Sequence, residues 1–174
     1  MPLTAANFVK TWIDMPEKVK AKPMRASQIS IAQLMQPEHA NSQGNVHGGW
    51  IMKLVDEAGA LACMRHAQRR VVTVAIDQMV FRQPIRIGDL VILSAEVTYT
   101  GRTSMEVEVQ VIAENPVSGE RTHTNTAYLV YVALGDNGKP APVPPLFAET
   151  EQEKLRMGQA RERQRHRLAQ SKDE

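Results

Sequence analysis

The chain has a single cysteine, Cys63, among its 174 residues, and it lacks any long apolar run. One thiol cannot form an internal disulfide, and no cysteine pair is present to bind zinc, so a reducing, cytoplasmic location is expected. No run approaches the roughly 18 apolar residues of a membrane-spanning helix. Residues 1–25 contain Asp14 and Glu17 and no central apolar stretch, which argues against a secretory signal or a transit peptide. Together these absences exclude the membrane, secreted and disulfide-stapled classes.

An excess of charge of one sign is also missing. The chain has 21 basic and 19 acidic residues, a net charge of +2, so its overall balance does not indicate nucleic acid as the main partner. The five histidines show no metal-ligand spacing, and neither an HExxH nor a GxSxG motif occurs. We therefore expect no metal, no other cofactor and no serine nucleophile. No internal repeat is visible, and the length fits one domain.

Hydrophobic patterning divides the chain into three zones. Residues 1–26 are interpreted as an N-terminal arm, residues 27–140 as the folded domain, and residues 141–174 as a proline-rich linker with a charged helix. Clustered prolines exclude a helix in the linker. Residues 154–167 carry a local charge of +5, which is more typical of a solvated terminal helix than of a surface for nucleic acid or acidic lipid.

The folded zone alternates between strand and helix periods. Residues 48–68 have apolar residues at helical spacing, whereas the flanking segments are rich in β-branched residues. We expect strands over residues 28–35, 71–81, 90–100, 103–113 and 121–134. In residues 103–113 apolar and polar side chains alternate, which indicates an antiparallel strand with one face in water. The order strand, helix and four strands (β-α-β-β-β-β) predicts an α+β fold, one long helix against an antiparallel sheet.

The expected helix is apolar nearly all round. One face carries six core candidates, and the opposite flank is also small or apolar. Because one sheet covers only one side of a helix, we expect a second subunit to cover the other; the two tails are the alternative. The core candidates are Ile51, Leu54, Val55, Ala58, Leu61 and Ala62.

Asp56 lies in the middle of the second apolar flank, among Met52, Gly59, Ala60 and Cys63. A carboxylate in such surroundings is costly unless something compensates it, and the small neighbours leave room for a ligand. One interpretation is a general base or nucleophile, and the other is a surface carboxylate at the helix edge. Cys63 is expected to be a small buried hydrophobic residue rather than a nucleophile.

The approach to this helix, residues 41–49, is polar and rich in glycine. Backbone N–H groups at a helix start, here those of Gly48 and Gly49, can polarise a carbonyl or stabilise an oxyanion. An ordinary glycine-containing loop is the alternative. Asp56 lies about two turns further along, roughly 10–13 Å by helix rise. Asp56 and the helix start of one subunit therefore need not act on the same bond.

These segments resemble the acyl-CoA thioesterases of the hotdog fold. The resemblance rests on MQPEHANSQGNVHGGWIMKLVDEAGALACMRH at residues 35–66, VTV at 72–74, FRQP at 81–84 and TGRTSM at 100–105, and it covers about residues 27–140. Within this family, the chain is similar to the group that includes the single-domain bacterial enzymes. It implies a long helix wrapped by a curved antiparallel sheet, and hydrolysis of acyl-CoA to free CoA and a carboxylic acid.

The resemblance also assigns residues. Asn41 and Asp56 match the active-site pair, which in this family comes from two subunits across a dimer interface. Gly48 matches the position whose backbone N–H polarises the thioester carbonyl. Asp56 would activate water as a general base or attack directly to give a mixed anhydride, and the sequence leaves both open. The family implies a homodimer and, as a trimer of dimers, a hexamer.

A turn between two expected strands holds Arg102, Thr103 and Ser104, which could bind CoA together with Arg65 near the helix end. A plain hairpin turn and a helix-terminal cation are the alternatives. Two other functions stay open. A hotdog dehydratase or hydratase needs a catalytic histidine, for which His47 is the only candidate. A non-catalytic acyl-CoA sensor would not need both polar residues of the active-site pair.

Overall fold

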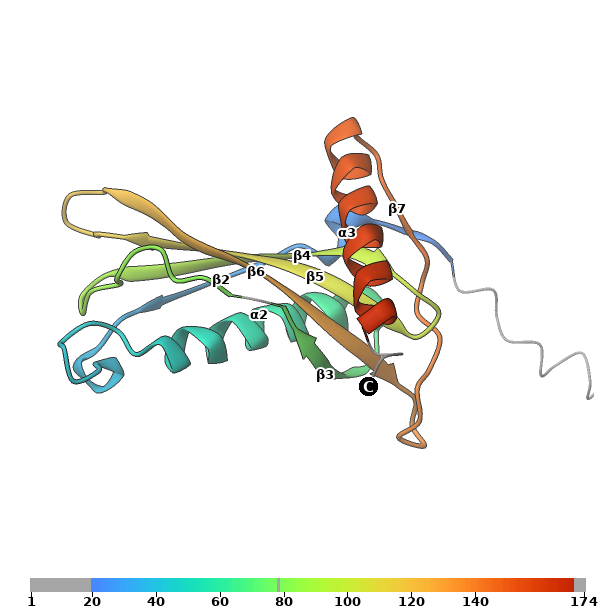
Figure 1. Ribbon diagram of the computed structural model, residues 1–174, viewed down its shortest axis with the longest axis horizontal. Helices are drawn as coiled ribbons and strands as arrows, with labels where there is room; N and C mark the ends of the chain where they lie inside the picture. Colours follow the sequence, from blue (N-terminus) through green and yellow to red (C-terminus); the bar gives the residue numbers. More distant parts are fainter. Residues whose placement is uncertain (1–19, 78, 171–174) are drawn as a thin grey trace, which may run out of the picture.

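A five-stranded antiparallel sheet curls around one long helix, and a second helix crosses its outer face (Figure 1). The computed structural model describes residues 20–77 and 79–170. The elements are β1 (Lys22–Pro23), the 3-10 helix η1 (Met24–Ser27), β2 (Ile29–Leu34), the 3-10 helix η2 (Pro37–His39), α2 (Gly48–Ala67), β3 (Arg70–Ile76), β4 (Leu90–Thr100), β5 (Ser104–Glu114), β6 (Arg121–Leu134), β7 (Leu146–Phe147) and α3 (Glu151–Gln170).

The sheet has the strand order β2-β4-β5-β6-β3, so β2 and β3 are its edges. The predicted order of one helix among five strands is confirmed, and so is the α+β class. The strand expected over residues 71–81 ends early, at Ile76. Asp77 interrupts the β-branched run there, and its N–H donates to the carbonyl oxygen of Tyr128 at 2.9 Å. The chain then leaves the sheet and approaches the start of α2 (Figure 1).

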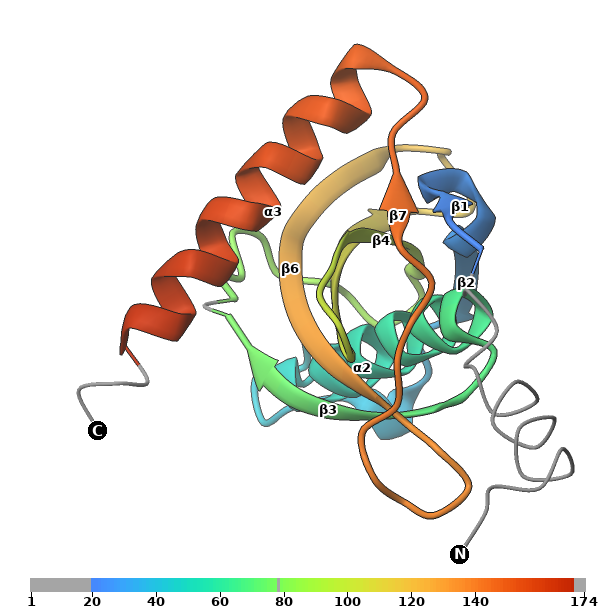
Figure 2. The same cartoon turned by 90° about the vertical axis from the view of Figure 1, so that its right-hand side faces the viewer.

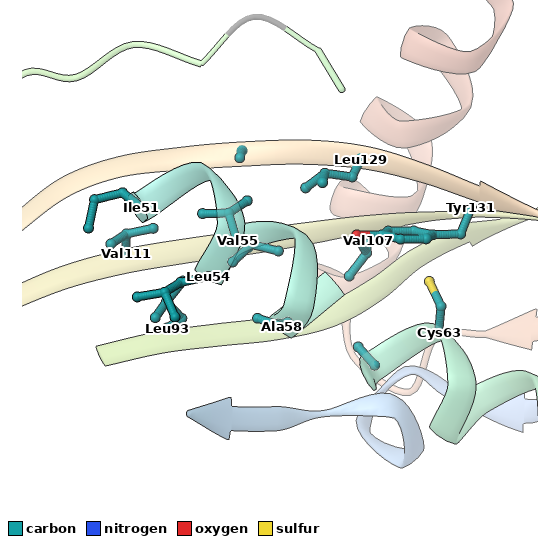
Figure 3. Close-up of a cluster of buried hydrophobic side chains, with 14 of the residues drawn as sticks. Ile51, Leu54, Val55, Ala58, Cys63, Leu93, Val107, Val111, Leu129 and Tyr131 are labelled. Atoms are coloured by element: carbon teal, nitrogen blue, oxygen red, sulfur yellow. The ribbon is translucent and has the colours of Figure 1, made fainter. Parts of the chain in front are cut away.

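The core lies between α2 and the concave face of the sheet. Figure 3 shows the side chains of α2 pointing at Leu93 on β4, Val107 and Val111 on β5, and Leu129 on β6, all of which are buried. Cys63 is fully buried as expected, and burial raises the pKa of its thiol. The predicted core face holds at five positions: Ile51, Leu54, Val55, Ala58 and Ala62.

The coverage of α2 differs from the expectation in two respects. Leu61, predicted in the core, is 44% exposed. Gly59 and Cys63 were expected to be covered by a second subunit. They are buried by the chain's own sheet instead, because the sheet curls past one side of the helix (Figure 2). Three apolar side chains of α2 remain exposed in the described chain: Met52, Leu61 and Met64.

The arm and the proline-rich segment pack against each other and against the end of α2. β1 pairs in parallel with β7, and Met24 is fully buried. Lys22 Nζ donates to the carbonyl oxygen of His66 at 2.7 Å, which satisfies a free acceptor at the helix C-terminus. The described parts of both tails therefore cover the end of α2 and leave Met52, Leu61 and Met64 exposed.

α3 is solvated along most of its surface, but one face packs on the sheet, which the expectation of a solvated helix did not include. Figure 2 shows β6 curving between α2 and α3, which lies on the convex face. Arg156 pairs with Glu96 at 2.6 Å, and Arg163 pairs with Glu106 at 2.7 Å. The guanidinium of Arg163 also lies 3.7 Å from the ring centroid of Tyr128.

The same contacts correct the expectation for β5. Its polar face was predicted to meet water, but Glu106 and Glu108 are buried under α3. Arginines and glutamates can be buried together when each neutralises the other. A pattern that scores both residue types as polar cannot distinguish this arrangement from a wet surface.

His66 makes folding stability depend on pH. Its Nε2 lies 2.8 Å from the carbonyl oxygen of Pro144, so the buried ring donates its proton there. Burial, with a smaller contribution from Lys22, lowers the pKa of His66 below its usual 6.5, although the bond to Pro144 opposes this. The unfolded chain therefore takes up the proton first, and stability is lost as the pH falls below that usual value.

We expect the urea midpoint to fall between about pH 7.5 and about pH 5.5, and to fall less in His66→Gln, whose amide can still donate to Pro144. Urea titrations of both proteins at several pH values check this. Equal pH dependence in the two proteins would contradict it.

Candidate functional site

The start of α2 is built by an unusual cap. His47 precedes the helix, and its Nδ1 accepts a hydrogen bond from the N–H of Gly49 at 2.9 Å. The Gly49 amide is therefore engaged in this structure, and its predicted role in stabilising an oxyanion stays a prediction. The Gly48 amide remains the candidate. A side chain there would approach the Phe81 ring to 3.6 Å, so glycine keeps the space between them open.

Asn41 is held rigidly at the mouth of this region. Its Oδ1 accepts hydrogen bonds from the N–H groups of Gln43 at 2.9 Å and Asn45 at 3.2 Å. Its own N–H donates to the carbonyl oxygen of Asn45 at 2.7 Å. With Oδ1 fixed by two bonds, the planar amide also fixes the position of Nδ2.

A cavity of about 230 Å³ brings two of the predicted residues together, Asn41 and Gly48. The β3–β4 segment supplies another wall, which includes Phe81 and Ile85. The N–H of Val46 donates to the carbonyl oxygen of Ile85 at 2.8 Å and joins this wall to the loop. The role of Phe81 as a lining residue was not predicted, because only the fold places this segment beside the helix start.

Asp56 does not line that cavity and has its own hydrogen bonds. Its Oδ1 accepts from Thr73 Oγ1 at 2.7 Å and from the Tyr131 hydroxyl at 3.0 Å. The Tyr131 hydroxyl also lies 2.9 Å from the backbone oxygen of Asp56. The carboxylate is half-buried at the border between α2 and the edge strand β3.

Sequence reasoning missed the roles of Thr73 and Tyr131. They lie on the two neighbouring strands β3 and β6 and reach Asp56 only after these strands pair. The one available signal was alternation, because Tyr128 and Val130 on the outer face place Tyr131 on the inner face.

The structure does not place the predicted CoA-binding residues at the cavity. The turn of residues 101–104 uses its backbone: the N–H of Ala133 donates to the Thr103 oxygen at 2.9 Å, and that of Val143 to the Arg102 oxygen at 3.1 Å. The N–H of Gly101 donates to the Ser104 oxygen at 2.8 Å. Arg65 donates to the carbonyl oxygen of Gln28 and so holds the start of β2. Binding of CoA by these residues stays a prediction.

Within residues 20–77 and 79–170, no group of three or more histidine, cysteine, aspartate or glutamate side chains is placed to hold a metal ion. In the same part of the chain, neither helix combines the length and the apolar composition needed to cross a bilayer.

Comparison with known proteins identifies related chains. A family model described as the thioesterase superfamily matches residues 43–120. The cytosolic acyl coenzyme A thioester hydrolase of Rattus norvegicus is 40% identical over 139 residues, which are 79% of this chain and 36% of that protein. The crystal structure of an apo-hexameric acyl-CoA thioesterase is 38% identical, with a TM-score of 0.84 over 88% of this chain and 98% of that one. The chain thus spans about a third of the rat relative and nearly all of the solved one.

An acyl-CoA hydrolase from Staphylococcus aureus, solved with butyryl coenzyme A, coenzyme A and coenzyme A disulfide, is also similar. It is 33% identical, with a TM-score of 0.81 over 88% of this chain and 93% of that one. Solved variants of that enzyme replace an asparagine, an aspartate 15 positions later and a threonine a further 17 positions on, each by alanine. The same spacings separate Asn41, Asp56 and Thr73.

Proposed function

The chain belongs to the thioesterase superfamily, and we propose that it hydrolyses acyl-CoA thioesters to free CoA and a carboxylic acid. The observation that carries this proposal is Asp56, a carboxylate fixed by Thr73 and Tyr131 where α2 meets the edge strand β3. The spacing of Asn41, Asp56 and Thr73, shared with the residues replaced in the S. aureus hydrolase, supports it.

The residues present account for each part of the chemistry. A thioester is activated, so water or a carboxylate can attack it without a serine nucleophile. As a general base, Asp56 takes a proton from water while the water oxygen attacks the carbonyl carbon. As a nucleophile, it forms a mixed anhydride that water then cleaves. In both cases the C–S bond breaks and CoA leaves as the thiolate, while the Gly48 N–H and Asn41 Nδ2 hold the carbonyl oxygen or the water.

The complete site requires two subunits. Asp56 lies eight residues after Gly48 on α2, roughly 12 Å by helix rise, and it does not line the cavity of Asn41. The strand β3, beside Asp56, is the last strand of the sheet described for residues 20–77 and 79–170, and it exposes Val72, Val74 and Ile76, which favours a second copy at this edge. In our proposal Asn41 and Gly48 of one subunit face Asp56 of the other.

We extend this dimer to a hexamer, a trimer of dimers, on the likeness to the apo-hexameric thioesterase. A reducing cytoplasmic location, expected from the single thiol, remains a prediction. The cap formed by His47 Nδ1 counts against the dehydratase alternative, because one ring nitrogen of the only candidate histidine already accepts a structural hydrogen bond.

The proposal is tested by release of free thiol from a panel of acyl-CoAs of increasing chain length. We expect turnover of at least one of them by the wild-type protein. Tight binding of acyl-CoA without any thiol release would instead establish the sensor alternative. Formation or loss of a double bond in the acyl chain, with the thioester intact, would establish the dehydratase or hydratase.

A further inference from the structure

We propose that Tyr131 is a positioning residue that fixes Oδ1 of Asp56, so that Oδ2 is the oxygen that acts on the substrate. This inference rests on the proposed function, since it assigns separate roles to the two oxygens of the carboxylate that the function requires. Tyr131 does not touch the substrate in this account and acts only through Asp56.

Tyr131 lies on the inner face of β6, fully buried beside Val107 (Figure 3). Its hydroxyl stands between two acceptors of one residue, the backbone oxygen of Asp56 at 2.9 Å and Oδ1 at 3.0 Å. A single donor shared by the main chain and the side chain of Asp56 restricts the side-chain rotamer as well as the position of the carboxylate. Most hydrogen bonds to a carboxylate fix only its end.

Gly59 makes this approach possible. It lies one turn after Asp56 on α2, and a Cβ there would come within 2.6 Å of the Tyr131 hydroxyl and 3.0 Å of Val107 Cγ1. Any larger residue would displace the ring from the helix. The buried glycine in the middle of α2, costly for a helix, is therefore explained by the contact that it permits.

The hydroxyl is a dependable donor. Burial and the nearby negative charge of Asp56 raise the pKa of Tyr131, so the phenol keeps its proton at any physiological pH. Thr73 donates to the same oxygen at 2.7 Å. Within residues 20–77 and 79–170, both side-chain donors to this carboxylate therefore go to Oδ1, and Oδ2 is left for the reaction.

The experiment compares Tyr131→Phe with a matched control, Tyr128→Phe, three residues earlier on β6 and on the outer face under Arg163. Each variant loses one oxygen atom and keeps the ring. We expect kcat of Tyr131→Phe to fall about ten- to a hundredfold with KM within about twofold, because a misplaced carboxylate slows the reaction without weakening substrate binding. Tyr128→Phe should keep the wild-type kcat.

A second measurement does not depend on activity. In a crystal structure of Tyr131→Phe we expect the Asp56 carboxylate to leave its wild-type rotamer or to split between two. An unmoved carboxylate, or an unchanged kcat, would overturn the positioning role. Absence of thiol release by the wild-type protein would instead refute the proposed function, and the crystal structure would still decide the role of Tyr131.

Discussion

Replacement of Asp56 by asparagine is expected to lower kcat by at least about a hundredfold, the range that a general base contributes. Asparagine has the same shape, and its Oδ1 can still accept from Thr73 and Tyr131. The fold should therefore survive while the proton acceptor or nucleophile is lost. Thiol release measures the rate, and urea unfolding checks the stability.

Mixing two inactive variants tests the shared site. A heterodimer of Asp56→Asn and Asn41→Ala contains one site with both native residues, because the first chain keeps Asn41 and the second keeps Asp56. In an equal, randomly assorted mixture half of the dimers are mixed and half of their sites are intact, so about a quarter of wild-type activity should return. Neither variant alone should recover activity in the same procedure.

Recovery of nothing in a verified heterodimer would mean that both residues serve one subunit, which contradicts the proposed arrangement. Full activity of Asp56→Asn alone would leave the family assignment intact and refute the mechanism. The two results therefore separate the question of where the site lies from the question of what Asp56 does.

The double replacement of Arg163 and Arg167 by glutamine is expected to have the largest effect on stability. Glu106 is fully buried and pairs with both arginines, and Arg167 also pairs with Asp77 at 2.7 Å. Removal of both cations leaves an uncompensated buried charge, which costs about 3–5 kcal/mol in such sites. The loss is limited to the docking free energy of α3 if the helix detaches and water reaches Glu106. Urea unfolding measures it.

The matched control replaces Arg161 and Arg165 by glutamine on the same helix. Both side chains are exposed, and Arg165 pairs with the exposed Glu162, so stability should change by less than about 1 kcal/mol. Addition of Glu106→Gln to the damaging double variant should restore part of the loss, because it removes the stranded charge. Equal losses in the two double variants would show that charge content, and not the buried pairing, stabilises α3.

Local sequence patterns were sufficient to predict the helix, the strands and two of the candidate site residues. The change from period two to period 3.6 and back predicted one helix among five strands, and the motif from Met35 to His66 predicted Asn41 and Asp56. The hydrogen bond from the Gly49 amide to His47 Nδ1 was not predicted, since histidine is an uncommon helix cap and the bond depends on the conformation of its ring.

Periodicity is a property of neighbouring residues, so the sequence by itself determined the helix and the strands, and its motifs identified the candidate residues for the chemistry. Only the tertiary structure decided what surrounds them. Thr73 and Tyr131 reach Asp56 from positions 17 and 75 residues away along the chain. Arg163 finds Glu106 across 57 residues. Such pairings depend on strand register and on the mutual neutralisation of buried charges. A hydropathy pattern does not contain this information, because it scores two oppositely charged side chains simply as two polar residues.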